Sequence, residues 1–436
     1  MDKAEAPPPA PGLVAAIRAY WKPRIALMLM LGFSAGLPFL LVFQTLSAWL
    51  TQAGVSRTEI GFFSWVGLAY AFKFLWAPVL DHVRIPWLSE RLGRRRSWML
   101  LAQAFVALGI ILVATSNPAE NLWGVAAFAV LIAFSSATQD IAIDAWRIEA
   151  APDSEQGNMA AVYQLGYRLA IMASGGGALI IADAVNWNTA YLAMAALMGV
   201  GAAAALLAPE PERAETDEPP TFSLAFARDA VISPFLDFLN RYGATALLIL
   251  ALIGTYRIPD FVMGVMARPF YLDVGFTLSE VGTISGVYGI WITIFGAFVG
   301  GLAVTGLGLR NALLIGAVIG SATNLIYIWL DALGPEQWGL IVAISAENLA
   351  GGFAGTALIA YMSSLTNTAF TATQYALFSS FYALPAKFMG GFSGLVVDAA
   401  GYPTFFLITA LTGVPAILLI LASTRERLAV NETRAT

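Results

Sequence analysis

The chain has 436 residues, of which 58% are hydrophobic and only 12% charged, and its mean hydropathy is +0.73. Soluble domains carry about 25% charged residues, so this composition indicates an integral membrane protein. The absence of cysteine excludes disulfides, thiol catalysis and thiolate metal sites, and the single histidine, His82, excludes a multi-histidine metal site.

The chain opens with a proline-rich, polar segment, residues 1–24. Three basic residues, Arg18, Lys22 and Arg24, stand directly before an apolar stretch. That stretch suits a membrane span better than a short cleavable signal, and no clear cleavage site follows it. We therefore predict a signal anchor whose N-terminus lies in the cytoplasm.

A hydropathy window of about 19–20 residues predicts an all-α protein with about twelve transmembrane helices. Their approximate spans are 25–50, 59–80, 97–116, 121–148, 157–182, 188–208, 244–271, 279–302, 310–331, 336–364, 371–398 and 401–423. They divide into two six-helix halves, residues 25–208 and 244–423. Between the halves, residues 209–243 are predicted to form a cytoplasmic linker with an amphipathic helix on the inner membrane surface, and residues 424–436 a cytoplasmic tail.

Positive charge is distributed unequally between the two sets of loops. With the N-terminus inside, the outer loops hold Arg57, and Arg268, near the end of the seventh span, is a candidate for a second arginine there. The inner loops and the tail hold a larger set: Arg84, Arg91, Arg94, Arg95, Arg96, Arg147, Arg213, Arg228, Arg241, Arg310, Arg425 and Arg427. This asymmetry predicts that both termini are cytoplasmic.

The two halves show weak internal similarity. At an offset of 215 residues, Gly175–Gly176 align with Gly390–Gly391 and Asp183 aligns with Asp398. At an offset of 221, Glu59, Gly61 and Ser64 align with Glu280, Gly282 and Ser285. Such repeats are typical of transporters built from two parallel six-helix halves.

Eight charged side chains lie well inside the predicted spans, away from their ends: Lys73, Asp140, Asp144, Arg168, Arg257, Asp260, Glu347 and Lys387. A charge at mid-membrane costs roughly 2.5–3.5 kcal/mol, so these groups are expected to face a wet interior. Both signs are present, which suits a site that binds a charged solute and moves protons. Lys73 lies near the inner end of its helix, where it can instead snorkel to the surface.

Asp81 at the end of the second span is followed by Gly93-Arg94-Arg95-Arg96. This pattern is similar to the major facilitator signature, an Asp at the end of helix 2 and a Gly-Arg-Arg loop before helix 3. The resemblance implies that Asp81 and the three arginines latch the two halves together on the inner side. The alternative is anchoring by inner positive charge alone.

In the fourth span, Asp140 and Asp144 are four residues apart and share one helix face, next to Gln139. Paired carboxylates favour uptake of a proton by one of them near neutral pH. Alternatively, they form structural ion pairs with Arg147 or Arg168.

The fifth span places Arg168 at depth, where its guanidinium can hold a carboxylate through two parallel hydrogen bonds. Tyr163 and Tyr167 lie deep in the same span and are candidates for ligand contact rather than for an interfacial belt.

The seventh span contains Arg257-Ile258-Pro259-Asp260. Pro259 lacks a backbone donor, so a bend is predicted here, and broken helices near the midplane are where substrate sites form. Arg257 and Asp260 are three residues apart and can pair, either for function or only to stabilise a kinked helix.

The tenth span carries Glu347-Asn348, and the eleventh carries Gln374 and Lys387. Glu347 is the intramembrane acid most isolated in the sequence, and Lys387 is its candidate partner.

Taken together, these segments resemble the AmpG family of muropeptide permeases. The matching stretches are Gly32–Pro38, Phe72–Pro78, Gln139–Ala145, Gly166–Arg168, Glu347–Asn348 and Ala372–Leu377. The resemblance implies a major facilitator fold and proton-driven import of N-acetylglucosaminyl-1,6-anhydro-N-acetylmuramic acid, with or without its peptide, across the bacterial inner membrane. It also implies roles in cell-wall recycling and, in some bacteria, in β-lactamase induction. The rival hypotheses are a facilitator for another bulky anion, such as acetyl-coenzyme A, and a membrane-embedded glycan-modifying enzyme.

The expected sites are therefore three. Candidate substrate-binding residues are Arg168, Arg257, Lys387, Tyr163, Tyr167, Gln139, Asn348 and Gln374. Candidate proton-coupling residues are Glu347, Asp144, Asp140 and Asp260, with Glu347 and Asp144 favoured, and candidate gating residues are Asp81, Arg94, Arg95 and Arg96. We expect no catalytic residue, cofactor, metal ion or nucleic acid, and a monomer in contact with membrane lipid.

Overall fold

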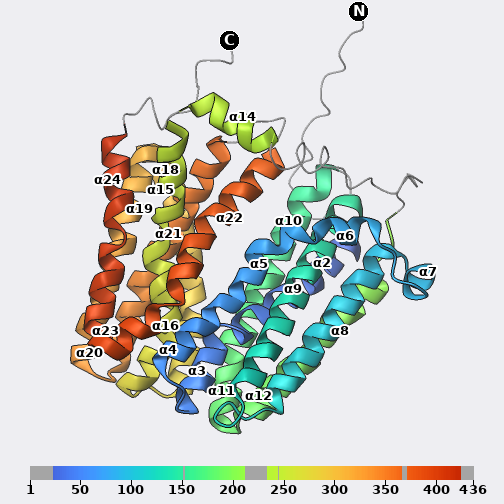
Figure 1. Cartoon of the computed structure of the whole chain (residues 1–436), viewed down its shortest axis with the longest axis horizontal. Coiled ribbons are helices and arrows are strands. Elements are labelled where there is room, and N and C mark those ends of the chain that lie inside the picture. The colour runs from blue at the N-terminus through green and yellow to red at the C-terminus, as the bar shows by residue number, and fades with distance from the viewer. Residues whose placement is uncertain (1–22, 151–152, 212–232, 244, 366–370, 424–436) are drawn as a thin grey trace, which may run out of the picture.

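The computed structural model describes residues 23–150, 153–211, 233–243, 245–365 and 371–423. Within these ranges the regular secondary structure is helical, and the helices form two bundles that lean against each other, as Figure 1 shows. The predicted fold class, an all-α membrane protein in two halves, is confirmed.

The N-terminal bundle begins at Pro23 and ends at Leu207. Its elements are α2 (Pro23–Leu41), α3 (Gln44–Gln52), α4 (Arg57–Phe63), η1 (Ser64–Gly67), α5 (Leu68–Phe72), η2 (Lys73–Leu75), α6 (Ala77–His82), α7 (Leu88–Leu92), α8 (Arg94–Ala114), α9 (Leu122–Ala150), α10 (Asp153–Met172), η3 (Ala173–Gly177), α11 (Ala178–Ala184) and α12 (Trp187–Leu207).

The C-terminal bundle follows a separate helix, α14 (Ser233–Tyr242). Its elements are α15 (Thr245–Tyr256), α16 (Ile258–Val274), α17 (Leu278–Val281), η5 (Gly282–Tyr288), α18 (Gly289–Leu307), α19 (Leu309–Ala322), η6 (Thr323–Leu325), α20 (Ile326–Leu333), α21 (Gln337–Leu365), α22 (Thr371–Gly390), α23 (Ser393–Leu411) and α24 (Val414–Ala422).

Ten helical stretches in the described part of the chain are long and apolar enough to cross a membrane, against about twelve predicted. The difference has two local causes. Residues 57–82 are broken into short α and 3₁₀ pieces, so no single helix there reaches spanning length. The other predicted span missing from the ten is 371–398, because its helix α22 carries polar residues such as Gln374 and Lys387; α23 and α24, on either side of Thr412–Gly413, together count as one of the ten.

The helix α14 marks one end of the molecule. Its residue Phe238 is fully buried and packs edge-on against Phe378 with ring centroids 5.0 Å apart, and Arg241 donates a hydrogen bond to the Leu365 carbonyl at 3.2 Å. The described part of the predicted amphipathic helix is therefore packed against the C-terminal bundle; its earlier residues, 224–231, lie outside the described ranges. We call this end of the protein the α14 end and the opposite end, where α4 begins, the α4 end (Figure 1).

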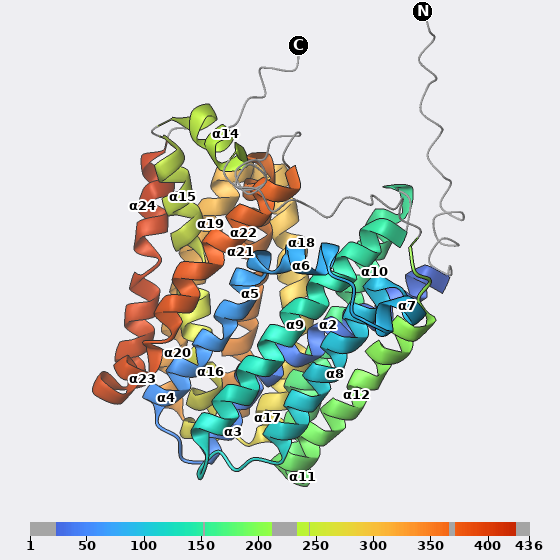
Figure 2. The same ribbon diagram turned by 45° about the vertical axis from the view of Figure 1, so that its right-hand side comes forward.

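The bundles converge toward the α4 end and diverge toward the α14 end, as Figures 1 and 2 both show. At the α4 end, α3 and α4 pack against α16 and α23, and η3 packs against η5. Repeated local structure accompanies this contact: Ser56 and Glu59 form a capping box at the start of α4, and Thr277 and Glu280 form its counterpart at α17. The counterpart lies 221 residues later, which is the predicted offset.

One charged residue lies at a place that the sequence leaves open. Arg268 was a candidate for an outer loop although the predicted span 244–271 includes it; the residue lies within α16 and its exposure is only 2%. Hydropathy places the end of a span only to within several residues, so a cation near that end can be assigned to the wrong side of it.

Candidate functional site

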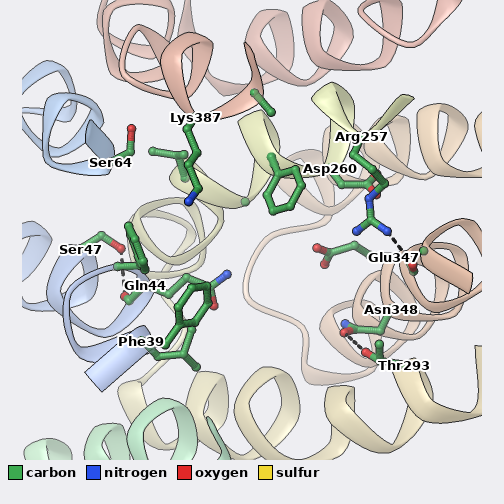
Figure 3. Close-up of a pocket in the computed structure, with 18 of the residues that line it drawn as sticks. Phe39, Gln44, Ser47, Ser64, Arg257, Asp260, Thr293, Glu347, Asn348 and Lys387 are labelled. Carbon is green, nitrogen blue, oxygen red and sulfur yellow. Dashed lines mark hydrogen bonds and ion pairs between the residues drawn. The ribbon is translucent and has the colours of Figure 1, made fainter. Parts of the chain in front are cut away.

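A cavity of about 520 Å³ lies between the two bundles. The N-terminal bundle lines it mainly with apolar side chains, among them Phe39, Phe43, Leu46, Ile60 and Phe63, together with Gln44, Ser47, Ser64 and Arg168. The C-terminal bundle contributes most of the polar groups: Arg257, Asp260, Thr293, Glu347, Asn348, Thr356 and Lys387. Figure 3 shows ten of the lining residues labelled, with side chains from both bundles converging on the same space.

The break between α15 and α16 positions an ion pair on the cavity wall. Arg257 occupies the interruption, and Pro259 follows in the first turn of α16, so the predicted bend at this proline is confirmed. Arg257 Nε lies 2.8 Å from Asp260 Oδ2, as the three-residue spacing predicts. The same guanidinium donates a hydrogen bond to the Gly351 carbonyl at 3.0 Å, which holds the broken helix against α21.

Glu347 and Asn348 project from the middle of α21 into the cavity (Figure 3). Glu347 accepts a hydrogen bond from the buried Tyr327 hydroxyl, which in turn lies 3.0 Å from the hydroxyl of Tyr271. Asn348 accepts a hydrogen bond from Thr293 at 2.7 Å. The acid is thus tied on one side to a buried hydroxyl chain and is open on the other side to the cavity.

Lys387 reaches from α22 to the opposite bundle. Its ammonium donates a hydrogen bond to the Gly67 carbonyl at 2.9 Å, in the short 3₁₀ segment η1. The expected pairing of Lys387 with Glu347 is therefore wrong in this conformation, and the two side chains lie apart in Figure 3. The cause is tertiary: the backbone of the neighbouring bundle supplies an acceptor nearer than the carboxylate.

Of the predicted residues that the structure describes, six line the cavity: Arg168, Arg257, Asp260, Glu347, Asn348 and Lys387. The two acids of α9, Asp140 and Asp144, are absent from its wall. Both lie within electrostatic reach of Lys73, and Asp144 also pairs with Arg147 at 3.7 Å, so one of the structural ion pairs offered as the alternative is present.

Three further predicted residues of the N-terminal bundle lie outside the cavity wall. Gln139 is fully buried and accepts a hydrogen bond from Ser34 at 3.0 Å. Tyr163 and Tyr167 lie one turn apart on α10, with ring centroids 6.2 Å apart. The side chains of Gln374 and Asp81 lie outside the part of the structure that is described.

The arginines predicted to form a gate contact their own bundle. Arg95 donates two hydrogen bonds to Glu149, at 2.9 and 2.6 Å, and the backbone amides of Arg95 and Arg96 donate to Glu210. The guanidinium of Arg96 also donates to the Ala205 carbonyl at 3.1 Å. In this conformation these two residues tie α8 to α9 and α12, and their role between the bundles stays a prediction, as does that of Arg94.

Side chains at the α4 end join the two bundles, and the sequence patterns predicted no role for them. Arg57 donates to Asp273, which also accepts from Tyr402 at 2.6 Å. Two further hydrogen bonds form a matched pair, in which Thr58 donates to Asp398 and Ser279 donates to Asp183. The hydroxyl residues differ by 221 positions and the acids by 215, so the internal repeat was the signal that could have found them.

Glycines of the same repeat bring the backbones together. A Cβ at Gly61 would lie 2.7 Å from the Gly391 carbonyl oxygen, and one at Gly282 would lie 2.9 Å from the Gly176 carbonyl oxygen. Such distances leave no room for a side chain. The α4 end is therefore closed by backbone contact beneath the hydrogen bonds, while the cavity lies on the α14 side of that closure.

Among the described residues, no group of three or more acidic or imidazole side chains gathers that would hold a metal ion. The arrangement is instead that of a cavity between two helical bundles: cations, carboxylates and hydrogen-bonding groups face one shared space, and the bundles touch mainly on one side of it.

Comparison with known proteins agrees with this geometry. The family model of the Major Facilitator Superfamily matches residues 83–386, and the model described as Acetyl-coenzyme A transporter 1 matches residues 24–125. Anhydromuropeptide permease of Escherichia coli K12 is 39% identical over 420 residues, covering 95% of this chain and 83% of that protein. Putative transporter AmpG 4 of Rickettsia conorii is 32% identical and covers 91% and 96% of the two chains.

The fold is also that of solved transporters. The crystal structure of a D-xylose–proton symporter superposes with a TM-score of 0.69 at 14% sequence identity, covering 94% of this chain and 98% of that one. The relatives are permeases and transporters, so the protein is a multi-pass membrane transporter and not an enzyme. By its matches over most of its length, the chain belongs to the major facilitator superfamily and, within it, to the family of AmpG transporters.

Proposed function

We propose that this protein imports anhydro-muropeptides, N-acetylglucosaminyl-1,6-anhydro-N-acetylmuramic acid with or without its peptide, across the bacterial inner membrane by alternating access. The observation that carries the proposal is the cavity between the bundles, into which cations of both halves project. A relative 39% identical and named for anhydromuropeptide supplies the substrate class. Import would feed cell-wall recycling.

Peptide-bearing muropeptides are anionic, and the cavity offers them three cationic side chains. Arg168 stands on the N-terminal wall and Arg257 and Lys387 on the C-terminal bundle. Carboxylates bind guanidinium groups through paired hydrogen bonds, which favours Arg168 and Arg257 as orienting groups. Asn348 and Thr293 add hydrogen-bonding groups for the sugar, and Tyr163, Tyr167, Gln139 and Gln374 stay candidates for other conformations of the cycle.

We infer that the α14 end faces the cytoplasm, with both termini on that side. Arginines at or near the ends of helices are numerous there, including Arg84, Arg91 and Arg310, while Arg57 marks the α4 end. In this orientation the conformation described is the inward-facing one, since the α4 end is closed. Residues 25–208 and 244–423 would move as the two rocking halves, joined by residues 209–243. Each chain encloses its own cavity within the lipid, so we take the transporter to act as a monomer.

We propose that protons drive import through buried carboxylates. Glu347 and Asp260 line the cavity, where a proton and a ligand can influence each other. Asp140 and Asp144 are the candidates of the N-terminal bundle, away from the cavity wall. On the inner side, Asp81 and the arginines at 94–96 are the residues proposed to close the cavity when the α4 end opens.

Uptake into proteoliposomes tests this function. Purified protein, labelled anhydro-muropeptide and an imposed inward proton gradient should give accumulation above the equilibrium level, with the ligand recovered unaltered. Dissipating the proton gradient with an ionophore should abolish accumulation of the ligand but should leave exchange of labelled for unlabelled ligand across the membrane. No uptake by protein that is folded and inserted would refute the substrate.

A second candidate substrate is acetyl-coenzyme A, because the model of an acetyl-coenzyme A transporter matches residues 24–125. The match is confined to the N-terminal bundle, so it covers only one wall of the cavity. Competition separates the two ligands: excess unlabelled acetyl-coenzyme A should leave muropeptide uptake unchanged, and inhibition with uptake of labelled acetyl-coenzyme A would favour the second candidate.

A further inference from the structure

Arg268 is a buried cation that the functions above do not use. It lies in α16 with an exposure of 2%, inside a segment that crosses the membrane. Among the described residues, no carboxylate forms an ion pair with it. Its hydrogen bond crosses to the other bundle, where Nη1 donates to the Gly175 carbonyl at 3.3 Å. A charge held at such depth is costly and marks a functional position.

The acceptor of this hydrogen bond lies at one of the close contacts between the two bundles. Gly175 belongs to the π-helical turn η3, and a second π-helical turn, η5, faces it from the C-terminal bundle. A Cβ at Gly286 would lie 2.6 Å from Gly176 Cα. π-Helical turns are rare and recur at functional sites, and here they shift backbone groups out of the regular helical ladder. We call Gly175, Gly176, Gly282 and Gly286 the glycine seam.

Arg268 lies one helical turn from a chain of hydrogen bonds that leads to the cavity. Tyr271, one turn further along α16, lies 3.0 Å from the Tyr327 hydroxyl, and Tyr327 donates to Glu347. Arg268 and Glu347 lie close enough for each to act on the charge of the other. Arg257 and Asp260 also act on Glu347, but they pair with each other, whereas Arg268 has no such partner among the residues described.

We propose that Arg268 is a positioning residue that couples the charge of Glu347 in the cavity to the glycine seam between the bundles. The proposal rests on the proposed role of Glu347 in proton binding. While Glu347 is ionised, its negative charge compensates Arg268, which stays buried and holds Gly175 across the seam. When Glu347 takes up a proton, Arg268 becomes a buried cation without compensation, and opening the seam to water relieves it.

This arrangement predicts how a proton and a ligand act on the seam. A proton on Glu347 favours opening of the α4 end, where the cavity then becomes accessible. An anionic ligand that enters restores negative charge near Arg268 and favours closing of the seam. The proton and the ligand therefore act on the seam in opposite directions.

Cysteine labelling without any substrate tests the coupling. The chain has no cysteine, so Ser47→Cys, at a buried position on the cavity wall, is a single reporter. A membrane-impermeant maleimide added on the α4 side should reach it only when the seam opens. We expect Glu347→Gln to raise the labelling rate about fivefold or more when Arg268 is present, and less than about twofold in the Arg268→Gln background. Equal effects in both backgrounds would overturn the proposal.

A matched control is Arg57→Gln, which loosens the α4 end at its surface pair with Asp273. The factor by which Arg57→Gln raises the labelling rate should multiply with the factor for Glu347→Gln, because Arg57 lies outside the path from Glu347 to the glycine seam. If Arg57→Gln and Arg268→Gln combine with Glu347→Gln in the same way, Arg268 has no special coupling role.

A second measurement needs no change at Arg268, which covers the case in which that variant does not fold. Labelling of Ser47→Cys, normalised to that of the exposed reporter Ala119→Cys to correct for thiol reactivity, should rise as the pH falls and should not respond in Glu347→Gln. A flat profile in the protein with Glu347 intact refutes the proposal. Because no muropeptide is present, these results are independent of whether the proposed substrate is correct.

Discussion

The C-terminal wall of the cavity carries an ion pair, a carboxylate and a carboxamide, whereas the N-terminal wall is mainly aromatic and aliphatic, with Arg168 as its cation. Outside the cavity the same two bundles are closely matched: each contributes a capping box, a glycine contact and a hydroxyl–carboxylate hydrogen bond at the α4 end. The duplicated features lie where the bundles contact each other. The features present in one bundle alone lie where a ligand would bind.

The strongest test of this division removes charge from the polar wall. Arg257→Ala and Lys387→Ala should each lower muropeptide uptake about 100-fold, because truncating one partner of a buried charged interaction costs about 2–5 kcal/mol. Uptake rates in proteoliposomes, corrected for the amount of inserted protein, measure the effect.

Phe39→Leu is the matched change on the apolar wall, since it keeps a hydrophobic side chain there. It should lower uptake less than about tenfold, because trimming an aromatic contact costs about 1 kcal/mol. If Phe39→Leu is as damaging as Arg257→Ala, the two walls do not differ in the way proposed.

The acids of the two bundles should also differ. Glu347→Gln should abolish accumulation driven by a proton gradient while sparing exchange, because Glu347 faces the cavity. Asp144→Asn should lower accumulation about tenfold at most, since Asp144 pairs with Arg147 away from the cavity and an ion pair of this exposure contributes about 1 kcal/mol. Accumulation ratios and exchange rates, measured in parallel, decide the comparison. Complete uncoupling by Asp144→Asn alone would move the proton site to the N-terminal bundle.

The matched glycines, Gly61 and Gly282, test whether the two bundles contribute equally to the contact at the α4 end. Gly61→Ala and Gly282→Ala each place a methyl group against a backbone carbonyl of the other bundle. Overpacking costs about 1–3 kcal/mol, so each should raise labelling of Ser47→Cys from the α4 side about tenfold. Gly306→Ala, where nothing lies within 4 Å of the added methyl group, is the control and should change little. A large difference between the first two would show that the bundles do not share the contact equally.

The smallest effects are expected from the paired hydrogen bonds. Asp183→Ala leaves the Ser279 hydroxyl without its acceptor, and Asp398→Ala does the same to both the hydroxyl and the backbone amide of Thr58. A hydrogen bond contributes about 0.5–1.5 kcal/mol, so labelling should rise about fivefold for Asp183→Ala and by a somewhat larger factor for Asp398→Ala. The double variant should raise the labelling rate by the product of the two single factors. A single variant that opens the α4 end fully would mean that one bond carries the closure alone.

Sequence reasoning located what depends on local spacing. Most of the spans, the bend at Pro259 and the Arg257–Asp260 pair follow from neighbouring residues and are present in the structure. It failed where a partner is distant and has no residue signature. Lys387 donates to a backbone carbonyl 320 positions away, and no side-chain pattern could have identified that acceptor.

Orientation about a helix axis was the other limit. Asp140 and Asp144 share a face, as their spacing predicts, but only packing against the other helices decides whether that face meets the cavity. Arg268 illustrates the same limit along the axis, because a cation near the end of an apolar segment can belong to a loop or to the interior. The repeat offsets of 215 and 221 relate the residues that form the hydrogen bonds at the α4 end. Alignment alone, however, does not show which of the aligned residues contact each other.

The bonds that close the α4 end are exposed, and this has a consequence for the speed of the transport cycle. Exposed ion pairs contribute about 0–1 kcal/mol and hydrogen bonds about 1 kcal/mol each, so Arg57–Asp273, Thr58–Asp398 and Ser279–Asp183 together hold the bundles by a few kcal/mol. Reversing a population from 1:99 to 99:1 takes about 5.5 kcal/mol, which is within reach of one bound ligand and one proton. Stronger bonds here would lengthen the lifetime of this conformation and slow turnover, so a weak closure favours a fast carrier.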